Sequence, residues 1–168
     1  MRQRRTLRSV GVAVLAAIPF LAITPLPAHA GTGGVWLCLT ETRGTGANIA
    51  RLPLGHTATF ELSFIHSVSH TPVRDLYRVE NGQIVQTAEI FLAHGAGLPS
   101  IANDMDATGW RHENGQFILD MHRLTGPIPL RIQAEFKNTL HIAGTDLPLA
   151  DLGHSAITLA PCDEETLK

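Results

Sequence analysis

Short segments of alternating apolar and polar residues limit what this chain can fold into. Over residues 59–64, Phe or Leu occupies every second position, and Thr, Glu or Ser lies between them. Such alternation predicts a β-strand with one buried face. Other segments are equally short and are separated by Gly, Pro and Asn, so we expect strands there too. The expected strands are one around Cys38 and those at residues 57–66, 73–80, 83–93, 117–122, 130–136, 140–143 and 156–159.

Turn sequences indicate how these strands connect. Asn81-Gly82 and Asn114-Gly115 are dipeptides that tolerate the positive φ angles of tight hairpins. After residue 30, no stretch keeps apolar residues at helical spacing for three turns, although residues 147–152 suit one short helical turn. We therefore predict an all-β fold, either an antiparallel β-sandwich or a small barrel of about 8–10 short strands.

The amino-terminal segment is expected to direct export. Four arginines precede an uncharged run from Val10 to Ile23, which is shorter than the roughly 20 apolar residues of a membrane span. Ala28-His29-Ala30 then places small residues where signal peptidase cuts. We predict a helical, cleavable signal peptide at residues 1–30, followed by a single exported β domain at residues 31–168 in the periplasm. An uncleaved anchor helix is the alternative; after cleavage no transmembrane span is expected.

Loss of this segment makes the domain acidic. The whole chain has 13 basic and 15 acidic side chains, and residues 1–30 hold four of the basic ones and none of the acidic ones. The formal charge of residues 31–168 is therefore −6. Nucleic acids select basic surfaces, so we predict no nucleic-acid partner. A domain of this size also buries a core without metals, and we predict no cofactor.

The two cysteines lie near opposite ends of the exported domain. Cys38 belongs to the first expected strand, and Cys162 follows the last one. In an oxidising compartment two cysteines allow only one connectivity. We predict a Cys38–Cys162 disulfide, with two unpaired thiols as the alternative. Closing so long a loop stabilises a fold by about 4 to 5 kcal/mol in the chain-entropy model.

Polar residues interrupt the apolar face of the first long hairpin. Simple antiparallel pairing around a loop at residues 67–72 places residue 66 opposite 73 and residue 64 opposite 75. His66, Asp75 and Tyr77 then share the face of the phenylalanine row. Each buried polar side chain needs a partner or costs about 1 to 3 kcal/mol. The three either satisfy one another and the loop backbone, or form a pocket in which the carboxylate sets the tautomer of His66.

The same residues and their neighbours include candidates for catalytic and metal sites. Ser67 or Ser69 is a possible nucleophile with His66 or His70 as base and Asp75 as orienter, but the chain has no Gly-x-Ser-x-Gly elbow. Histidines 66, 70 and 94 lack tight ligand spacing. Residues 104–109 resemble the start of a calcium loop whose closing glutamate is missing. We therefore predict no metal site and assign no catalytic residue.

Several short motifs resemble the bacterial family catalogued as domain of unknown function 1850. They extend over Phe64-Ile65-His66-Ser67-Val68, Thr71-Pro72-Val73, Asp75, Tyr77, Phe91 and Gly95-Ala96-Gly97-Leu98-Pro99. Asp75 stands where that family usually has Glu. Such proteins are small, exported or membrane-anchored, and accompany tripartite periplasmic transporters of the TAXI type. The resemblance therefore implies an accessory role in the cell envelope and supplies no activity.

The glycine-rich turn of that pattern adds a possible ligand contact. Glycines at positive φ expose backbone N–H groups, although tight turns without a ligand use the same residues. Three functions remain open: a periplasmic accessory or binding module for a transporter component or small anionic solute, a small exported hydrolase using His66 with Asp75, or a structural envelope domain. The predicted ligand-binding or structural cluster is His66, Ser67, Thr71, Asp75, Tyr77, Gly95, Ala96 and Gly97.

Overall fold

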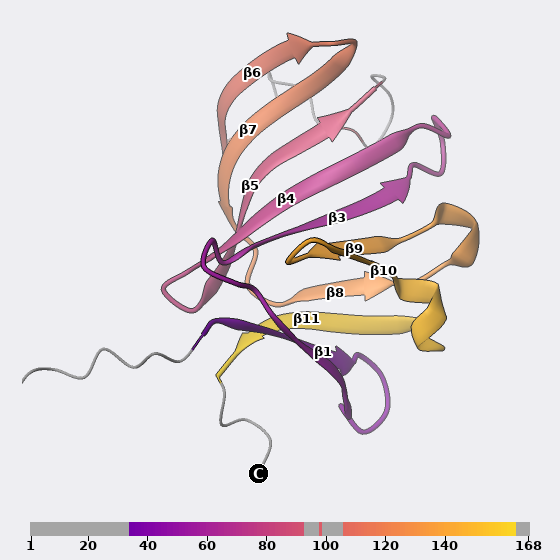
Figure 1. The fold of residues 1–168 in the computed structure, drawn as a ribbon. Helices are drawn as coiled ribbons and strands as arrows, with labels where there is room; N and C mark the ends of the chain where they lie inside the picture. Colours follow the sequence, from indigo (N-terminus) through magenta and orange to yellow (C-terminus); the bar gives the residue numbers. More distant parts are fainter. Residues whose placement is uncertain (1–33, 93–97, 99–105, 164–168) are drawn as a thin grey trace, which may run out of the picture. The chain divides into compact units, whose positions relative to one another are not determined.

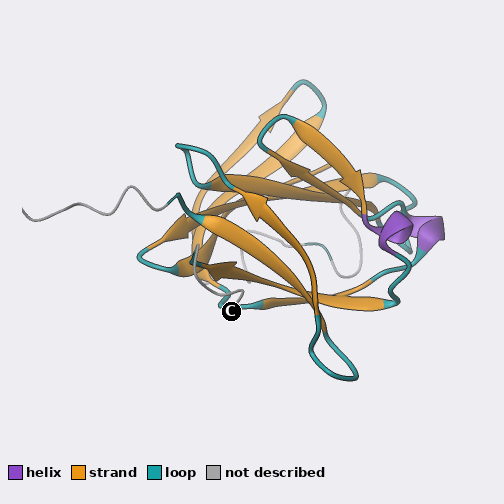
Figure 2. Ribbon diagram, turned by 60° about the horizontal axis from the view of Figure 1, so that its bottom comes forward, coloured by secondary structure: helices purple, strands orange, loops and turns teal. Residues whose placement is uncertain are grey.

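Strands make up most of the chain that the computed structural model describes, namely residues 34–92, 98 and 106–163. The predicted signal peptide and residues 93–97, 99 and 104–105 of the segments above lie outside the described residues. Figure 2 shows the strands in orange and two short helical turns in purple. The strands are β1 Trp36–Glu41, β2 Asn48–Pro53, β3 Thr59–Ile65, β4 Pro72–Glu80, β5 Gln83–Phe91, β6 Ala107–Glu113, β7 Gln116–Leu124, β8 Ile128–Arg131, β9 Thr139–Ile142, β10 Thr145–Pro148 and β11 Ala156–Cys162.

Two antiparallel sheets form a sandwich, which confirms the predicted fold class. The smaller sheet has the order β2-β1-β11-β8, and the larger has the order β10-β9-β3-β4-β5-β7-β6 (Figure 1). The main hydrophobic cluster contains Leu37 and Leu159 of the smaller sheet and Phe60 and Leu140 of the larger one. A second cluster, around Val73, Phe91 and Leu119, belongs to the larger sheet alone. None of the described helices is long and apolar enough to cross a membrane.

The expected strand at residues 130–136 is wrong in its second half. β8 ends at Arg131, and residues Ala134–Phe136 form the 3₁₀ helix η1. The pairing of β8 with β11 ends at Arg131 and Ala156. One more bond, from the Ile132 N–H to the Ser155 carbonyl, follows before the chain turns into η1. A second 3₁₀ helix, η2 at Leu149–Leu152, matches the single helical turn expected over residues 147–152.

The register of the β3–β4 hairpin differs from the expected one by two residues. Phe64 lies opposite Val73, Leu62 opposite Asp75, and Phe60 opposite Tyr77. The hairpin closes tighter than expected because the His66 N–H donates to the Thr71 carbonyl at 2.9 Å. A shift of two residues keeps every side chain on its face. Asp75 and Tyr77 therefore still share the face of the phenylalanine row, and the Phe60 and Tyr77 rings stack at 5.0 Å.

The predicted disulfide is present and lies within the smaller sheet. It joins Cys38 of β1 to Cys162 of β11, two strands that pair directly. The bond therefore ties the first described strand to the last.

Candidate functional site

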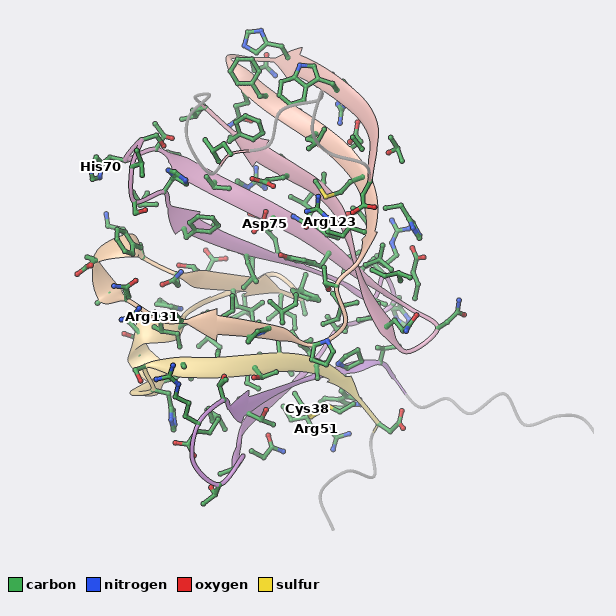
Figure 3. All side chains as sticks on the ribbon, turned by 180° about the vertical axis from the view of Figure 1, so that it is seen from behind. Cys38, Arg51, His70, Asp75, Arg123 and Arg131 are labelled. Carbon is green, nitrogen blue, oxygen red and sulfur yellow. A yellow bond between two sulfur atoms is a disulfide. The ribbon has the colours of Figure 1, made fainter. Side chains whose placement is uncertain are left out.

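A row of polar side chains crosses the larger sheet between its two hydrophobic clusters. Asp75 Oδ1 accepts a hydrogen bond from Gln86 Nε2 at 3.0 Å, and Gln86 Oε1 accepts one from Arg123 Nη1 at 3.1 Å. Arg123 Nε donates to Asp106 Oδ2 at 3.0 Å. Figure 3 shows Asp75 and Arg123 on this sheet, away from His70. We call Asp75, Tyr77, Gln86, Arg123 and Asp106 the inner polar cluster.

Irregular strand pairing orients the side chains of the inner polar cluster. Register shifts occur at Leu76/Tyr77 between β4 and β5, at Gln86/Ala88 between β5 and β7, and at Ala107/Gly109 between β7 and β6. Three successive strand pairs therefore carry an irregularity beside the cluster. An extra residue in one strand bends it and redirects its side chains, so these shifts help to bring together groups from three strands and from Asp106, which directly precedes β6.

Burial dominates the electrostatics of the inner polar cluster. Removal of Asp75 from water raises the pKa of its carboxyl to about 6 from an ordinary 3.8, although hydrogen bonds from Tyr77 and Gln86 and the charge of Arg123 oppose this rise. Burial, together with the nearby carboxylates of Asp75 and Glu89, also raises the pKa of Tyr77. The Asp75 carboxyl thus changes charge close to physiological pH.

The other predicted residues form a separate loop motif. His66 Nδ1 accepts a hydrogen bond from the Ser69 N–H at 3.2 Å, and Ser69 Oγ is 2.8 Å from Thr71 Oγ1. Ser67 is exposed. Among the described residues, no hydrogen bond or ion pair joins His66 to Asp75. The structure therefore brings Asp75 together with Tyr77, and His66 with Ser69 and Thr71, as two distinct groups.

A groove at the β8 edge of the smaller sheet contains two arginines. Its volume is about 530 Å³, and its lining includes Arg43, Arg131, Leu130 and Ile132. Figure 3 shows Arg131 near the end of β8. Arg43 follows β1 and Arg131 ends β8, and both strands pair with β11. We call this feature the arginine groove.

These two arginines differ from the others that the structure describes. Within residues 34–92, 98 and 106–163, neither Arg43 nor Arg131 has an ion pair or side-chain hydrogen bond. By contrast, Arg51 donates to the Asp163 carbonyl, and Arg74, Arg78, Arg111 and Arg123 each contact a carboxylate. Sequence reasoning missed this site because Arg43 and Arg131 are far apart in the chain and belong to no motif. Only the pairing of β11 with both β1 and β8 brings their segments together.

Comparison with known families gives one match. Residues 60–149 match the family model described as Domain of unknown function (DUF1850). The match covers more than half of the chain and includes the whole inner polar cluster, the loop motif and Arg131. No curated protein and no solved structure matches the chain significantly.

Proposed function

The chain belongs to the DUF1850 family, whose function is unknown, and on that premise we propose that it is an exported binding module for a small organic carboxylate held in the arginine groove. The observation that carries the proposal is the pair of arginines in one groove without protein partners among the described residues. In this account the inner polar cluster and the His66 loop support the fold rather than contact the ligand.

The chemistry of the groove favours a carboxylate. A guanidinium presents N–H donors in a planar fork that matches the two oxygens of a carboxylate. Leu130, Ile132 and Pro129 supply apolar surface for a short hydrocarbon chain beside these charges. The exported domain is acidic overall, so most of its surface repels an anion. Electrostatic attraction is strongest where arginines, such as the two in this groove, are not neutralised by protein carboxylates.

We further propose a periplasmic accessory role beside a solute transporter. The predicted signal peptide and the disulfide both suit an oxidising compartment outside the cytoplasm. The motif resemblance supports a TAXI-type tripartite transporter as the neighbour. A binding module that holds a carboxylate would raise the local concentration of that carboxylate near the transporter.

Binding is tested by ¹H–¹⁵N NMR titration of the exported protein with its disulfide intact. The probe is glutarate, and the matched uncharged ligand is its diamide. We expect glutarate alone to shift backbone amides near residues 131–133 and 155–156. Arg43→Ala and Arg131→Ala should each weaken binding about tenfold, which is about 1.4 kcal/mol. Arg78→Ala, which removes an exposed arginine on the other sheet, should leave the affinity unchanged.

Two outcomes contradict the binding proposal. One is the absence of shifts at millimolar glutarate, citrate and a monocarboxylate, which favours a structural envelope domain. The other is equal affinity in the double arginine variant. The transporter role is tested separately by uptake of labelled carboxylate in cells that lack the protein. Wild-type protein should restore uptake and Arg131→Ala should not; equal restoration by both would refute a role for the groove in transport.

A further inference from the structure

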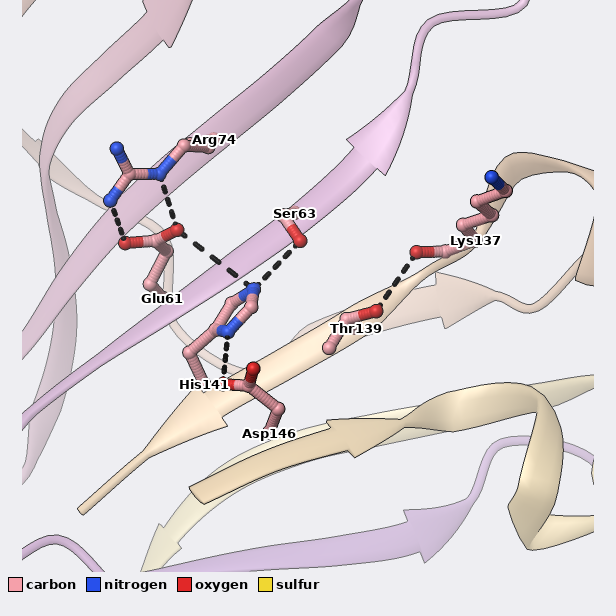
Figure 4. A network of polar contacts seen from close by, with 7 residues as sticks. All are labelled: Glu61, Ser63, Arg74, Lys137, Thr139, His141 and Asp146. Atoms are coloured by element: carbon pink, nitrogen blue, oxygen red, sulfur yellow. Dashed lines mark hydrogen bonds and ion pairs between the residues drawn. The ribbon is translucent and has the colours of Figure 1, made fainter. Parts of the chain in front are cut away.

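Ser63, His141 and Asp146 form a hydrogen-bonded series on the larger sheet. Ser63 Oγ lies 2.7 Å from His141 Nε2, and His141 Nδ1 lies 2.7 Å from Asp146 Oδ1. Figure 4 shows the imidazole between the hydroxyl and the carboxylate. A carboxylate only accepts hydrogen bonds, so Nδ1 carries the proton that it donates to Asp146. In the neutral ring Nε2 then accepts the Ser63 hydroxyl proton.

Strand register creates this series from residues far apart in the chain. His141 of β9 lies opposite Asp146 of β10 on one side and opposite Glu61 of β3 on the other. Ser63 is two residues from Glu61, so it shares the same face and reaches His141 diagonally. The neighbouring Leu62 and Leu140 point the other way, into the core. The core alternation of β3 and β9 therefore places these polar groups outward.

A second ion pair flanks the series. Arg74 donates to both oxygens of Glu61, at 2.6 and 2.7 Å, and Glu61 Oε1 lies 3.9 Å from His141 Nε2. Arg74 also lies directly opposite Ser63 in the β3–β4 pair. Arg74, whose charge is paired with Glu61, is thus the cationic residue opposite Ser63. β3 is hydrogen-bonded on both sides, and Arg74 Nε and Nη2 are engaged with Glu61. In the proposal below, Arg74 Nη1 is therefore the donor for an anionic oxygen.

A groove borders the imidazole, although Ser63 and Arg74 are outside its lining. Its volume is about 460 Å³, and His141, Asp146, Glu61 and Thr87 are among its lining residues. We propose that Ser63 is an activated nucleophile with His141 as its general base, and that this face hydrolyses short-chain carboxylic esters. Asp146 is a positioning residue that holds the imidazole. The site lies on the larger sheet, so it is independent of the arginine groove.

The chemistry balances with water as the only co-reactant. Ser63 Oγ attacks the ester carbonyl carbon while His141 Nε2 takes the hydroxyl proton. The bond from carbon to the alkoxy oxygen breaks, and His141 returns the proton to the departing alcohol. Water then attacks the acylated serine with His141 again as base, which releases the carboxylic acid and restores Ser63. Arg74 stabilises the negative oxygen in both steps.

Covalent labelling tests the nucleophile directly. The exported protein is treated with a fluorophosphonate, and the modified residue is mapped by mass spectrometry. We expect labelling at Ser63, its loss in Ser63→Ala, and a fall in rate of 10²-fold or more in His141→Gln. Ser69→Ala is the matched control and should label at the wild-type rate. Thermal unfolding of each variant shows whether it is folded.

The hydrolysis of p-nitrophenyl acetate separates positioning from structure. The groups facing His141 are Glu61 from β3, Arg74 from β4 through its pair with Glu61, and Asp146 from β10. Asp146 is 75% exposed, so Asp146→Asn should lower kcat/KM less than His141→Gln and should change its pH profile. A folded wild-type protein without label at Ser63 overturns the proposal. So does label at Ser67 or Ser69 instead, an outcome that favours the His66 alternative.

Discussion

At the scale of single residues, Asp75 makes the stability of the fold depend on pH. Its carboxyl lies in the inner polar cluster with a pKa of about 6 in the folded protein and an ordinary value of 3.8. The folded state therefore binds this proton more tightly than the unfolded state. The contribution of Asp75 to the free energy of unfolding is therefore fully present below about pH 4 and is lost as the pH rises through about 6.

Asp75→Asn should remove that pH dependence. The amide oxygen still accepts from Gln86, while the cost of a partly buried charge disappears. A difference of two pKa units corresponds to at most about 3 kcal/mol. Urea unfolding between pH 4 and 7 should show the free energy of unfolding falling in the wild type and staying level in the variant. The exposed Asp151→Asn control should retain the wild-type slope; an unchanged slope in Asp75→Asn would contradict the assignment.

His66→Ala should weaken the β3–β4 loop without unfolding the protein. The ring accepts a hydrogen bond from the Ser69 N–H, and its loss is expected to lower the free energy of unfolding by about 1 kcal/mol. Amide exchange at Ser69 should quicken. Ser67→Ala, at an exposed neighbouring position, should change neither quantity. Exchange at Ser69 as slow as in the wild type would mean that His66 does not hold the loop.

At the scale of elements, the interior strands were predictable and three edge strands were not. β3, β4, β5, β7, β9 and β11 each have a partner on both sides or a strong alternation, and the sequence indicated all of them. β2, β6 and β10 were not among the expected ranges, and all three are edge strands. An edge strand pairs on one side only and buries fewer side chains, so its alternation is weaker.

The candidate sites show the same limit. The shared face of Asp75 and Tyr77 follows from alternation alone, because residues two positions apart in a strand point to the same face of the sheet. The contacts with Gln86 and Arg123 depend on the strand order and on the β-bulges. Neither the strand order nor the bulges can be predicted from the local sequence. The Ser63 and His141 contact likewise requires β9 to pair with β3. The sequence of a single segment does not predict which distant strand it will pair with.

The β4–β5 hairpin offers a test of local turn chemistry. Asn81 has φ 51° and Gly82 has φ 74°, as the Asn-Gly pair predicted. Asn81→Ala should lower the free energy of unfolding by about 1 kcal/mol, because Ala lacks the short polar side chain that lets Asn adopt the left-handed region. Asn81→Gly is the matched variant and should be nearly neutral by thermal unfolding. Equal loss in both variants would point to the Asn side chain instead of its backbone.

At the scale of the whole domain, the disulfide links the ends of a long loop. Cys38 and Cys162 are separated by 124 positions, and loss of such a link costs about 3 to 5 kcal/mol. The double variant Cys38→Ala/Cys162→Ala should lose this free energy of unfolding and therefore unfold at a lower urea concentration. The reduced wild-type protein should have the same urea midpoint as the double variant. The double variant itself should not respond to reductant. A midpoint that is independent of redox state would show that the bond adds little to stability.

The pairing of β1 with β11 also sets an order of assembly. The hairpins β3–β4 and β4–β5 need only neighbouring segments, so they can form while the rest of the chain is still being made. The smaller sheet has β1 and β11 at its centre, so it cannot close until Cys162 has emerged. Distant contacts of this kind slow folding. β1 can pair early with β2 on one side, but its other side must stay unpaired until β11 is made, which leaves an open strand edge that needs protection from misfolding.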